Sequence, residues 1–208
     1  MLKLIVFDCD GVMFDSKQAN IAYYNHLLDH FGLPKMDSGE EDYVHMSSVI
    51  EAITRIFSRH RSPNLDQVHE YRLQITYEPF LQHMKMEPDL VYFLERVWKK
   101  YRLAISTNRT NTMLPLLESH NLDHYFEKVV TAATAKRPKP APDGLLEILD
   151  HFNCAPEEAL FIGDSIVDQQ HASACGVDLI AFKNSDLEAR YHVDSFKEIL
   201  QLPPFGRS

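Results

Sequence analysis

The fold of this chain is decided by one short stretch, Lys3-Leu4-Ile5-Val6-Phe7-Asp8-Cys9-Asp10-Gly11-Val12. Its apolar first half is typical of a strand that is buried in a parallel sheet. The apolar run ends at two carboxylates, Asp8 and Asp10, and the Gly11 that follows them permits a tight turn. Ligands of open α/β sheets bind just beyond the carboxyl ends of the strands, where these two carboxylates would lie. For this stretch taken alone, an acidic turn that only closes a strand is the alternative.

The composition is that of a globular, acidic chain. Its 208 residues are enough for one ordinary domain with a smaller insertion, and 45% of them are hydrophobic, which favours a packed core. Lys and Arg total 21 against 30 Asp and Glu, so the formal net charge is −9. Nucleic acids and anionic membrane surfaces bind clustered cations, and this balance therefore argues against both as partners.

The cellular compartment is predicted from three features. No apolar run approaches the ~18 residues that a transmembrane helix needs. The opening residues 1–3 lead directly into the first predicted strand, which leaves no room for a signal peptide. Cys9, Cys154 and Cys175 are widely spaced and odd in number, as free thiols of a reducing compartment are. We therefore expect a cytoplasmic protein with no membrane partner, and its state as monomer or homodimer stays open.

A helical segment follows the first strand. Apolar residues recur at helical spacing over residues 17–31, 43–58 and 65–83, which predicts three helices, with Ser16 as the N-cap of the first. Pro79 is expected to bend or end the third helix. The segment contains no convincing strand. We therefore expect a small helical domain over residues 16–83, inserted into a main domain that consists of residues 1–15 and 84–208.

Strands and helices alternate in the rest of the chain, which indicates parallel βαβ units. The predicted fold class is α/β, with a doubly wound parallel sheet and an inserted helical domain. Further strands are predicted over residues 103–108, 128–131, 159–162 and 177–181, and helices over residues 89–101, 112–120, 142–152, 166–175 and 195–202.

Three of the predicted strands finish in polar side chains or lead directly into them. These side chains suit phosphate and metal, because carboxylates gathered at one sheet edge repel one another and need a cation among them. All-oxygen ligands favour Mg²⁺, and a lysine and a hydroxyl can bind phosphoryl oxygens. The residues are Asp8 with Asp10, Thr107 with Asn108, Asp164 with Asp168 one helical turn later, and Lys139 in a proline-rich loop beside Lys136 and Arg137.

Four motifs in this order resemble those of the haloacid dehalogenase-like (HAD) superfamily, in its phosphoglycolate-phosphatase-like branch. The resemblance covers essentially the whole chain, and the helical insertion resembles the family's type-1 cap. It implies a Rossmann-like core and a Mg²⁺-dependent phosphatase that acts on a small phosphorylated metabolite. Motif I is matched by Asp8-Cys9-Asp10-Gly11, motif II by Thr107 and Asn108, motif III by Lys139-Pro140-Ala141-Pro142, and motif IV by Gly163-Asp164-Ser165 with Asp168.

The resemblance also implies a role for each motif residue. Asp8 would be the nucleophile that forms an aspartyl-phosphate, and Asp10 would be the general acid and base. The carboxylates of Asp8 and Asp164 and the backbone carbonyl of Asp10 would bind Mg²⁺. Asp168 would orient Lys139 or a metal-bound water.

The phosphoryl oxygens would be held by Thr107, Asn108 and Lys139. Ser106 precedes Thr107, and a shift of one residue in strand register would exchange the two hydroxyls. We prefer Thr107 because Asn108 follows it, as an asparagine commonly does in the family.

Two other functions stay open. The first is a phosphotransferase similar to β-phosphoglucomutase, although family mutases have a histidine twelve positions beyond the nucleophile and this chain has Asn20 there. The second is a regulatory member that binds phosphate without catalysis, which the complete set of acidic and basic groups argues against. A haloacid dehalogenase is not expected, because those enzymes lack an equivalent of Asp10.

The substrate itself is not evident from the sequence. In this architecture the helical cap closes over the site and selects the substrate. The region of residues 43–48 lacks the glycine expected in a substrate-specificity loop, which speaks against phosphoglycolate itself. The residues of the cap that are candidates for contacting the substrate are His45, Arg55, Arg59, His60 and Arg61. Of these, the basic cluster Arg59-His60-Arg61 could meet a second anionic group such as a carboxylate, and an exposed, solvated face is the alternative for that cluster.

Overall fold

The computed structural model describes residues 1–46, 49–60 and 63–206. The chain divides into two compact units, one of Met1–Phe14 with Met86–Ser208 and one of Asp15–Lys85. We call them the core unit and the cap unit. None of the helices in the described part of the chain has the length and hydrophobicity that a bilayer crossing requires.

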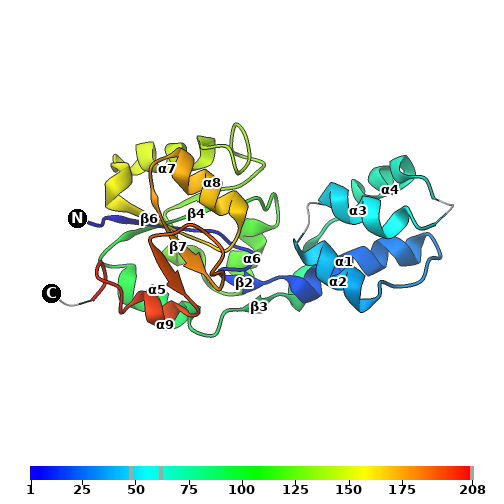
Figure 1. Ribbon diagram of the computed structural model, residues 1–208, viewed down its shortest axis with the longest axis horizontal. Coiled ribbons are helices and arrows are strands. Elements are labelled where there is room, and N and C mark those ends of the chain that lie inside the picture. Colours follow the sequence, from blue (N-terminus) through cyan, green and yellow to red (C-terminus); the bar gives the residue numbers. More distant parts are fainter. Residues whose placement is uncertain (47–48, 61–62, 207–208) are drawn as a thin grey trace. The chain divides into compact units, whose positions relative to one another are not determined.

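A six-stranded sheet with all neighbouring strands parallel forms the centre of the core unit (Figure 1). Because the chain builds the sheet outward from β1 in both directions, the switch in strand order lies at β1. The predicted doubly wound parallel sheet is confirmed. The strand order is β5-β4-β1-β6-β7-β8, with β1 at Leu4–Phe7, β4 at Arg102–Ser106, β5 at Lys128–Val130, β6 at Ala159–Gly163, β7 at Asp178–Phe182 and β8 at Tyr191–Val193.

Helices cover both faces of this sheet. Figure 1 shows α7 (Asp143–Phe152) and α8 (Ile166–Ala174) on one face, with α5 (Leu90–Val97) and α9 (Phe196–Ile199) on the other. The core unit also contains α6 (Met113–Ser119) and the short 3₁₀ helices η2 (Asp123–Tyr125) and η3 (Pro156–Glu158).

The side chains of β1 explain this arrangement. All four residues of the strand are completely buried. Leu4 and Val6 belong to the hydrophobic cluster that includes residues of α7 and α8. Phe7 faces the opposite way, where its ring meets those of Phe93 in α5 and Phe196 in α9. A strand that is buried on both faces needs apolar residues at every position, which is why its sequence is an unbroken apolar run.

The cap unit is a cluster of helices around its own apolar core. That core is formed by buried residues of four helices, among them Leu27, Ile53, Phe57 and Val68. The chain enters the unit through β2 (Phe14–Asp15) and leaves it through β3 (Lys85–Met86), and these two strands pair. The helices are α1 (Lys17–His30), α2 (Ser38–Met46), α3 (Val49–Phe57), α4 (Leu65–Arg72) and the 3₁₀ helix η1 (Glu78–His83).

Two helix predictions in the cap unit were wrong in extent. The helix expected over residues 43–58 is two helices, α2 and α3, and residues 47–48 between them lie outside the described part. Ile50, one of the apolar residues of that predicted helix, is 63% exposed, and the buried residues of α3 begin at Ala52. The helix expected over residues 65–83 ends at Arg72, and Pro79 is the second residue of η1, where its missing N–H costs no hydrogen bond.

The start of α1 also differs from expectation. Ser16 occupies the N-cap position, but its side chain makes no capping hydrogen bond. The backbone N–H of Lys17 donates instead to Oδ1 of Asp15, at 2.9 Å. A carboxylate one position earlier therefore takes over the stabilising role at this helix start.

Candidate active site

Strand register brings three of the predicted motifs to one edge of the sheet. Phe7 at the end of β1 pairs with Ile105 of β4 on one side and with Ile162 of β6 on the other. The residues that follow these strands, Asp8, Thr107 and Asp164, therefore emerge at about the same level. This edge is the carboxyl end of the sheet at its switch point, where α/β folds bind ligands.

Gly11 leaves the space that the Asp164 carboxylate occupies. Its φ of +80° is strained for any residue with a side chain, and a Cβ there would lie 1.9 Å from Oδ2 of Asp164. Gly163 has a similar role beside Asp168, whose Cβ would be 2.4 Å from an added Cβ. Gly11 is thus required by the close approach of a carboxylate and by its backbone conformation, and Gly163 by the close approach of the Asp168 side chain.

Three carboxylates form an acidic cluster at this edge. Oxygen atoms of Asp8, Asp164 and Asp168 all lie within 4.8 Å of one another. Burial, and secondly the charge of Asp168, raise the pKa of Asp8 to about 7. Burial and the charges of Asp8 and Asp168 raise the pKa of Asp164 to about 8. The cluster therefore favours a cation, which would let all of its members ionise.

Lys139 supplies one positive charge to this cluster. Its Nζ lies 2.7 Å from Oδ1 of Asp8 and 2.6 Å from Oδ1 of Asp168. Burial by itself lowers the pKa of this lysine, but the two carboxylates outweigh burial and raise the pKa above its ordinary value. Lys139 is therefore a buried, permanently charged group beside Asp8.

Asp168 is fully engaged by neighbouring groups. Its Oδ1 binds Lys139, and its Oδ2 accepts hydrogen bonds from the Ser165 hydroxyl at 2.6 Å and from the Ser165 N–H at 3.2 Å. Ser165 is the N-cap of α8, and Asp168 is the third residue of that helix, so the two form a reciprocal capping box. The start of α8 thereby holds the Asp168 carboxylate against Lys139.

Asn108 holds the loop that carries Lys139. Its Nδ2 donates to the carbonyl oxygen of Lys139 at 3.1 Å, and its Oδ1 accepts from the N–H of Lys139 at 3.0 Å. The sequence placed Asn108 among the phosphate-binding residues, whereas the structure commits both ends of its amide to the Lys139 backbone. Its side chain is therefore a support for Lys139.

The two candidate hydroxyls have different surroundings. Ser106 Oγ is buried and lies 2.9 Å from Nε2 of His171. Nδ1 of His171 lies 2.7 Å from the carbonyl oxygen of Ala141, which can only accept, so Nδ1 carries the proton and Nε2 accepts from Ser106. Thr107 lies one residue beyond β4, and its Oγ1 accepts from the N–H of Arg109 at 3.1 Å.

His171 stays neutral in this position. Burial, and secondly the charge of Lys139, lower its pKa from the ordinary 6.5 to about 4. A neutral ring with a fixed tautomer joins the end of β4 to the loop after Lys139. No sequence motif singled out this residue, because its partners are distant in the sequence.

Arg109 was also missed. Its Nη2 lies 2.8 Å from Oδ1 of Asp10, and its Nη1 donates to Oγ1 of Thr112 at 3.1 Å. The side chain of Arg109 is 7% exposed, against 37% for that of Asp10. In the sequence, its position directly after motif II was the feature that could have marked Arg109 as a site residue. Asn184 was missed as well, and its Nδ2 donates to the carbonyl oxygen of Asp164 at 2.7 Å.

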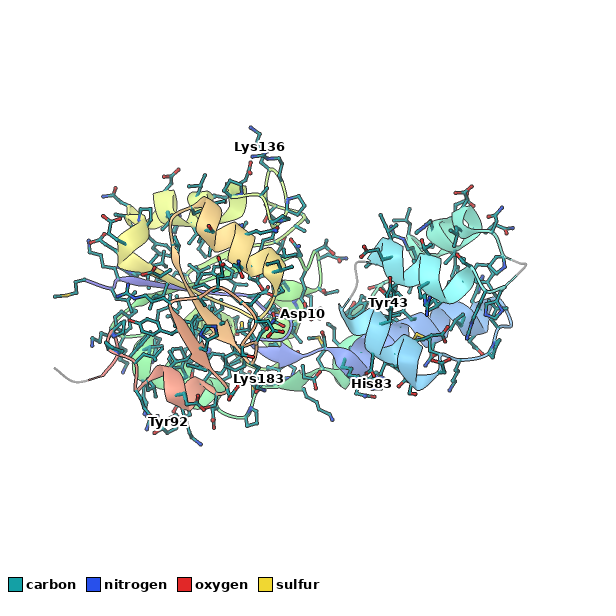
Figure 2. All side chains as sticks on the ribbon, viewed as in Figure 1. Asp10, Tyr43, His83, Tyr92, Lys136 and Lys183 are labelled. Atoms are coloured by element: carbon teal, nitrogen blue, oxygen red, sulfur yellow. The ribbon has the colours of Figure 1, made fainter. Side chains whose placement is uncertain are left out.

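The other cations of the lysine loop do not join the cluster. Figure 2 shows Lys136 projecting away from Asp10, and this residue is exposed. Arg137 forms an ion pair with Asp143, with an Nη2–Oδ2 distance of 2.8 Å. Within the loop, Lys139 is therefore the cation that faces the carboxylates.

The basic candidates of the cap unit are partly engaged with neighbours. Arg59 pairs with Glu40 at 2.9 Å and donates to Nε2 of His60 at 3.0 Å. The guanidinium of Arg55 lies over the ring of Tyr43. The side chain of His45 and all of Arg61 lie outside the described part of the chain.

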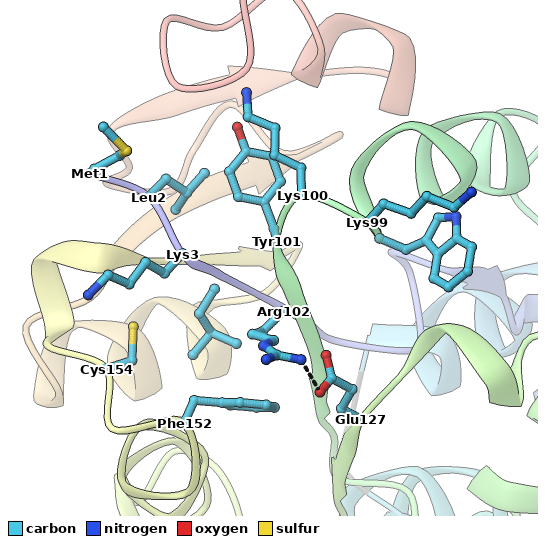
Figure 3. A pocket seen from close by; sticks show the side chains of 12 residues that line it. Met1, Leu2, Lys3, Lys99, Lys100, Tyr101, Arg102, Glu127, Phe152 and Cys154 are labelled. Carbon is cyan, nitrogen blue, oxygen red and sulfur yellow. Dashed lines mark hydrogen bonds and ion pairs between the residues drawn. The ribbon is translucent and has the colours of Figure 1, made fainter.

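A separate cavity of about 550 Å³ lies at the amino ends of β1 and β4 (Figure 3). Two of its cations are neutralised by carboxylates, Arg102 by Glu127 and Lys3 by Glu158, each at 2.7 Å. None of the predicted site residues lines it. Because it lies at the opposite end of the strands from the acidic cluster, it is not the site that the motifs form.

Comparison with known proteins gives consistent relatives. Residues 5–182 match the family described as haloacid dehalogenase-like hydrolase. A phosphoglycolate phosphatase of Aliivibrio fischeri is 27% identical over 99% of this chain and 98% of its own length. The pyrophosphatase PpaX of Bacillus velezensis is 28% identical over 79% of this chain and 75% of its own length. A HAD-superfamily hydrolase of subfamily IA, variant 1, from Geobacter sulfurreducens has a solved structure with a TM-score of 0.87 and 34% identity, covering 99% of this chain and 97% of that one.

Proposed function

The chain belongs to the haloacid dehalogenase-like hydrolase family, and from that premise we propose that it is a Mg²⁺-dependent phosphatase that hydrolyses a small phosphomonoester. The observation that carries this proposal is the contact of Lys139 with Asp8 inside a cluster of three carboxylates. Relatives named phosphoglycolate phosphatase and pyrophosphatase PpaX support phosphate chemistry. The expected partner is therefore a small phosphorylated metabolite.

In the proposed first step Asp8 is the nucleophile. A carboxylate oxygen of Asp8 attacks phosphorus, the bond from phosphorus to the ester oxygen breaks, and an aspartyl-phosphate forms. Asp10 gives a proton to the departing oxygen, so that the leaving group departs as a neutral alcohol. Lys139 balances negative charge on the phosphoryl oxygens, and its 2.7 Å contact with Asp8 supports this placement.

In the second step the acyl phosphate is hydrolysed. Asp10, now a carboxylate, takes a proton from a water molecule whose oxygen attacks phosphorus. The bond from phosphorus to Asp8 breaks, which releases inorganic phosphate, restores Asp8 and leaves the proton on Asp10 for the next cycle. One aspartate thus carries the phosphoryl group while the other carries the proton.

The donor set fits Mg²⁺. The carboxylates of Asp8 and Asp164 and the backbone carbonyl of Asp10 would hold the ion with hard oxygen ligands. The raised pKa values of Asp8 and Asp164 support a cation at this position. When bound, Mg²⁺ supplies positive charge that stabilises ionised Asp8 and the phosphoryl oxygens. Asp168 is not assigned as a ligand, because Lys139 and Ser165 occupy its oxygens.

Thr107 is the proposed phosphate-binding hydroxyl. The Ser106 hydroxyl donates to buried His171, which supports a structural role for Ser106. Asn108 acts on the phosphate only indirectly, by holding Lys139 through two hydrogen bonds to its backbone.

The mutase alternative has less support. The position where family mutases carry a histidine is Asn20, whose Oδ1 accepts a hydrogen bond from the Tyr77 hydroxyl at 2.8 Å. An amide in this bond cannot exchange a proton as a histidine does. The regulatory alternative would leave Asp8 without a catalytic use, although its burial is costly.

Release of inorganic phosphate tests the proposal. Purified protein is given a panel of phosphomonoesters that includes phosphoglycolate, together with the anhydride pyrophosphate, in the presence of Mg²⁺ or of EDTA; these two compounds are chosen because of the relatives. We expect turnover of at least one ester that needs Mg²⁺, and a loss of about 10³-fold or more in Asp8→Asn, because nucleophile removal has effects of that size. Asp143→Asn, which alters a carboxylate outside the cluster, is the control. Equal release by the Asp8→Asn and unmutated proteins would contradict the mechanism.

A further inference from the structure

We propose that Arg109 is a positioning residue for Asp10, and that its guanidinium fixes the carboxylate that exchanges the proton. The proposal rests on the phosphatase function proposed above and adds a residue that the family motifs of this chain do not include. Its basis is the ion pair between Nη2 of Arg109 and Oδ1 of Asp10, at 2.8 Å. Two further observations support it: Arg109 has several other hydrogen bonds, and the Asp10 carboxylate has fewer.

Arg109 is anchored through its backbone and through its side chain. Its backbone N–H donates to Oγ1 of Thr107, and its carbonyl oxygen accepts from the N–H of Ala132 at 2.9 Å. Its Nη1 donates to Oγ1 of Thr112, a buried residue at the start of α6. The side chain of Arg109 is 7% exposed, its backbone is hydrogen-bonded and its Nη1 is held by Thr112. We therefore expect the guanidinium to keep its direction during the reaction.

Asp10 is the less constrained partner. Its side chain is 37% exposed and lies on the short loop between β1 and β2. Within the described residues, the Asp10 carboxylate has a hydrogen bond at Oδ1, from Arg109, and none at Oδ2. Arg109 thus holds one oxygen of the carboxylate and leaves the other to exchange the proton.

This geometry has a kinetic consequence. Proton transfer requires the carboxylate oxygen within hydrogen-bond distance of the departing oxygen or of water. A displacement of about 1 Å costs on the order of 10²-fold in rate. Arg109 holds the Asp10 carboxylate in one orientation. Loss of Arg109 should therefore lower kcat, because a displaced Asp10 transfers the proton more slowly, and should have little effect on substrate binding.

Two other roles for Arg109 make different predictions. If the guanidinium bound the substrate phosphate directly, its loss would raise KM whether or not Asp10 was present. If Arg109 only stabilised the fold, its loss would lower the stability of the protein and reduce the amount of active enzyme without any dependence on Asp10. The effect of the Arg109 substitution on kcat, measured with and without the Asp10 carboxylate, therefore distinguishes the three roles.

A double-mutant cycle measures that dependence. The variants are Arg109→Gln, Asp10→Asn and the two combined, with kcat and KM measured for p-nitrophenyl phosphate and for the best ester of the panel. We expect Arg109→Gln to lower kcat by about 10- to 100-fold, with KM changed less than about threefold. In the Asp10→Asn background the same substitution should change kcat by less than about threefold. Arg109→Lys keeps a cation and should recover part of the loss.

Controls separate the outcomes. Arg137→Gln removes another arginine near the lysine loop and should leave kcat unchanged, and urea unfolding of every variant reports its folding. An equal loss from Arg109→Gln in both backgrounds, or a change confined to KM, overturns the positioning role while the phosphatase function stands. If Arg109→Gln does not fold, Arg109→Lys in the two backgrounds decides by the same criterion. No turnover by the unmutated protein on any ester would overturn the proposed function and this role together.

Discussion

At the residue scale, the acidic cluster depends on a glycine as much as on its carboxylates. Gly11→Ala places a Cβ at a φ of +80° and 1.9 Å from an oxygen of Asp164. The backbone strain costs about 1–2 kcal/mol in the free energy of unfolding. In addition, Asp164 must move, so we expect Mg²⁺-dependent phosphate release to fall by about tenfold or more. Urea unfolding and a steady-state phosphate assay measure the two effects.

Gly32 provides the matched control for this substitution. It has a φ of +66°, and an added Cβ would meet nothing within 4 Å. Gly32→Ala should therefore lower stability through strain alone and leave phosphate release unchanged in the folded protein. A Gly11→Ala protein with full activity would show that the Asp164 carboxylate does not need this space.

At the scale of elements, the start of α8 links helix capping to the site. Ser165 caps the helix, and its hydroxyl donates to Oδ2 of Asp168, which also accepts from the backbone N–H groups of Asp164 and Ser165. Ser165→Ala should lower the free energy of unfolding by about 1 kcal/mol, as loss of an N-cap does. Since Asp168 holds Lys139, we also expect phosphate release to fall by about tenfold.

The N-cap of α9 is the control for that prediction. Ser195 accepts from the N–H of Glu198 in the same way, but α9 is not an element that carries site residues. Ser195→Ala should show a comparable loss of stability, measured by urea unfolding, and unchanged phosphate release. Equal activities of the Ser165→Ala and Ser195→Ala proteins would mean that the Ser165 cap does not affect the position of Lys139.

At the scale of the whole molecule, a buried histidine makes stability depend on pH. The pKa of His171 falls from 6.5 to about 4 on folding, so between these values the unfolded chain binds more protons at this position. Stability due to His171 is therefore retained above about pH 6.5 and lost as pH falls toward 4, with a slope of up to about 1.4 kcal/mol per pH unit. The raised pKa values of Asp8 and Asp164 change the free energy of unfolding with pH in the opposite direction. The contribution of His171 must therefore be obtained from the difference in stability between the unmutated protein and a variant without this histidine.

The comparison of His171→Gln with the unmutated protein isolates this contribution. Urea unfolding at several pH values between 4 and 7 should show the unmutated protein losing stability relative to the variant as pH falls. His151→Gln, at an exposed position, controls for removal of a histidine as such. Parallel stability curves for His171→Gln and the unmutated protein would contradict the inferred neutral state of His171.

Some features of this protein were determined by the sequence by itself. A strand buried on both faces must be apolar at every position, so 4–7 and 159–162 were recognisable as strands from local pattern. Polar residues directly after such strands must lie at one sheet edge, which is why Asp8, Thr107 and Asp164 could be named as neighbours. The breaks between the cap helices were less predictable, because periodicity continues where tertiary packing ends a helix.

Only the tertiary structure decided which side chains of the site are hydrogen-bond or ion-pair partners. Arg109 lies 99 positions from Asp10, and His171 lies 65 positions from Ser106. The amide of Asn108 could have bound phosphate, but the fold places the backbone of Lys139 against it. Local sequence determines which residues have the right chemistry and which elements carry them. Which side chains share a hydrogen bond depends on distances that arise only when the strands, helix α8 and the lysine loop pack together.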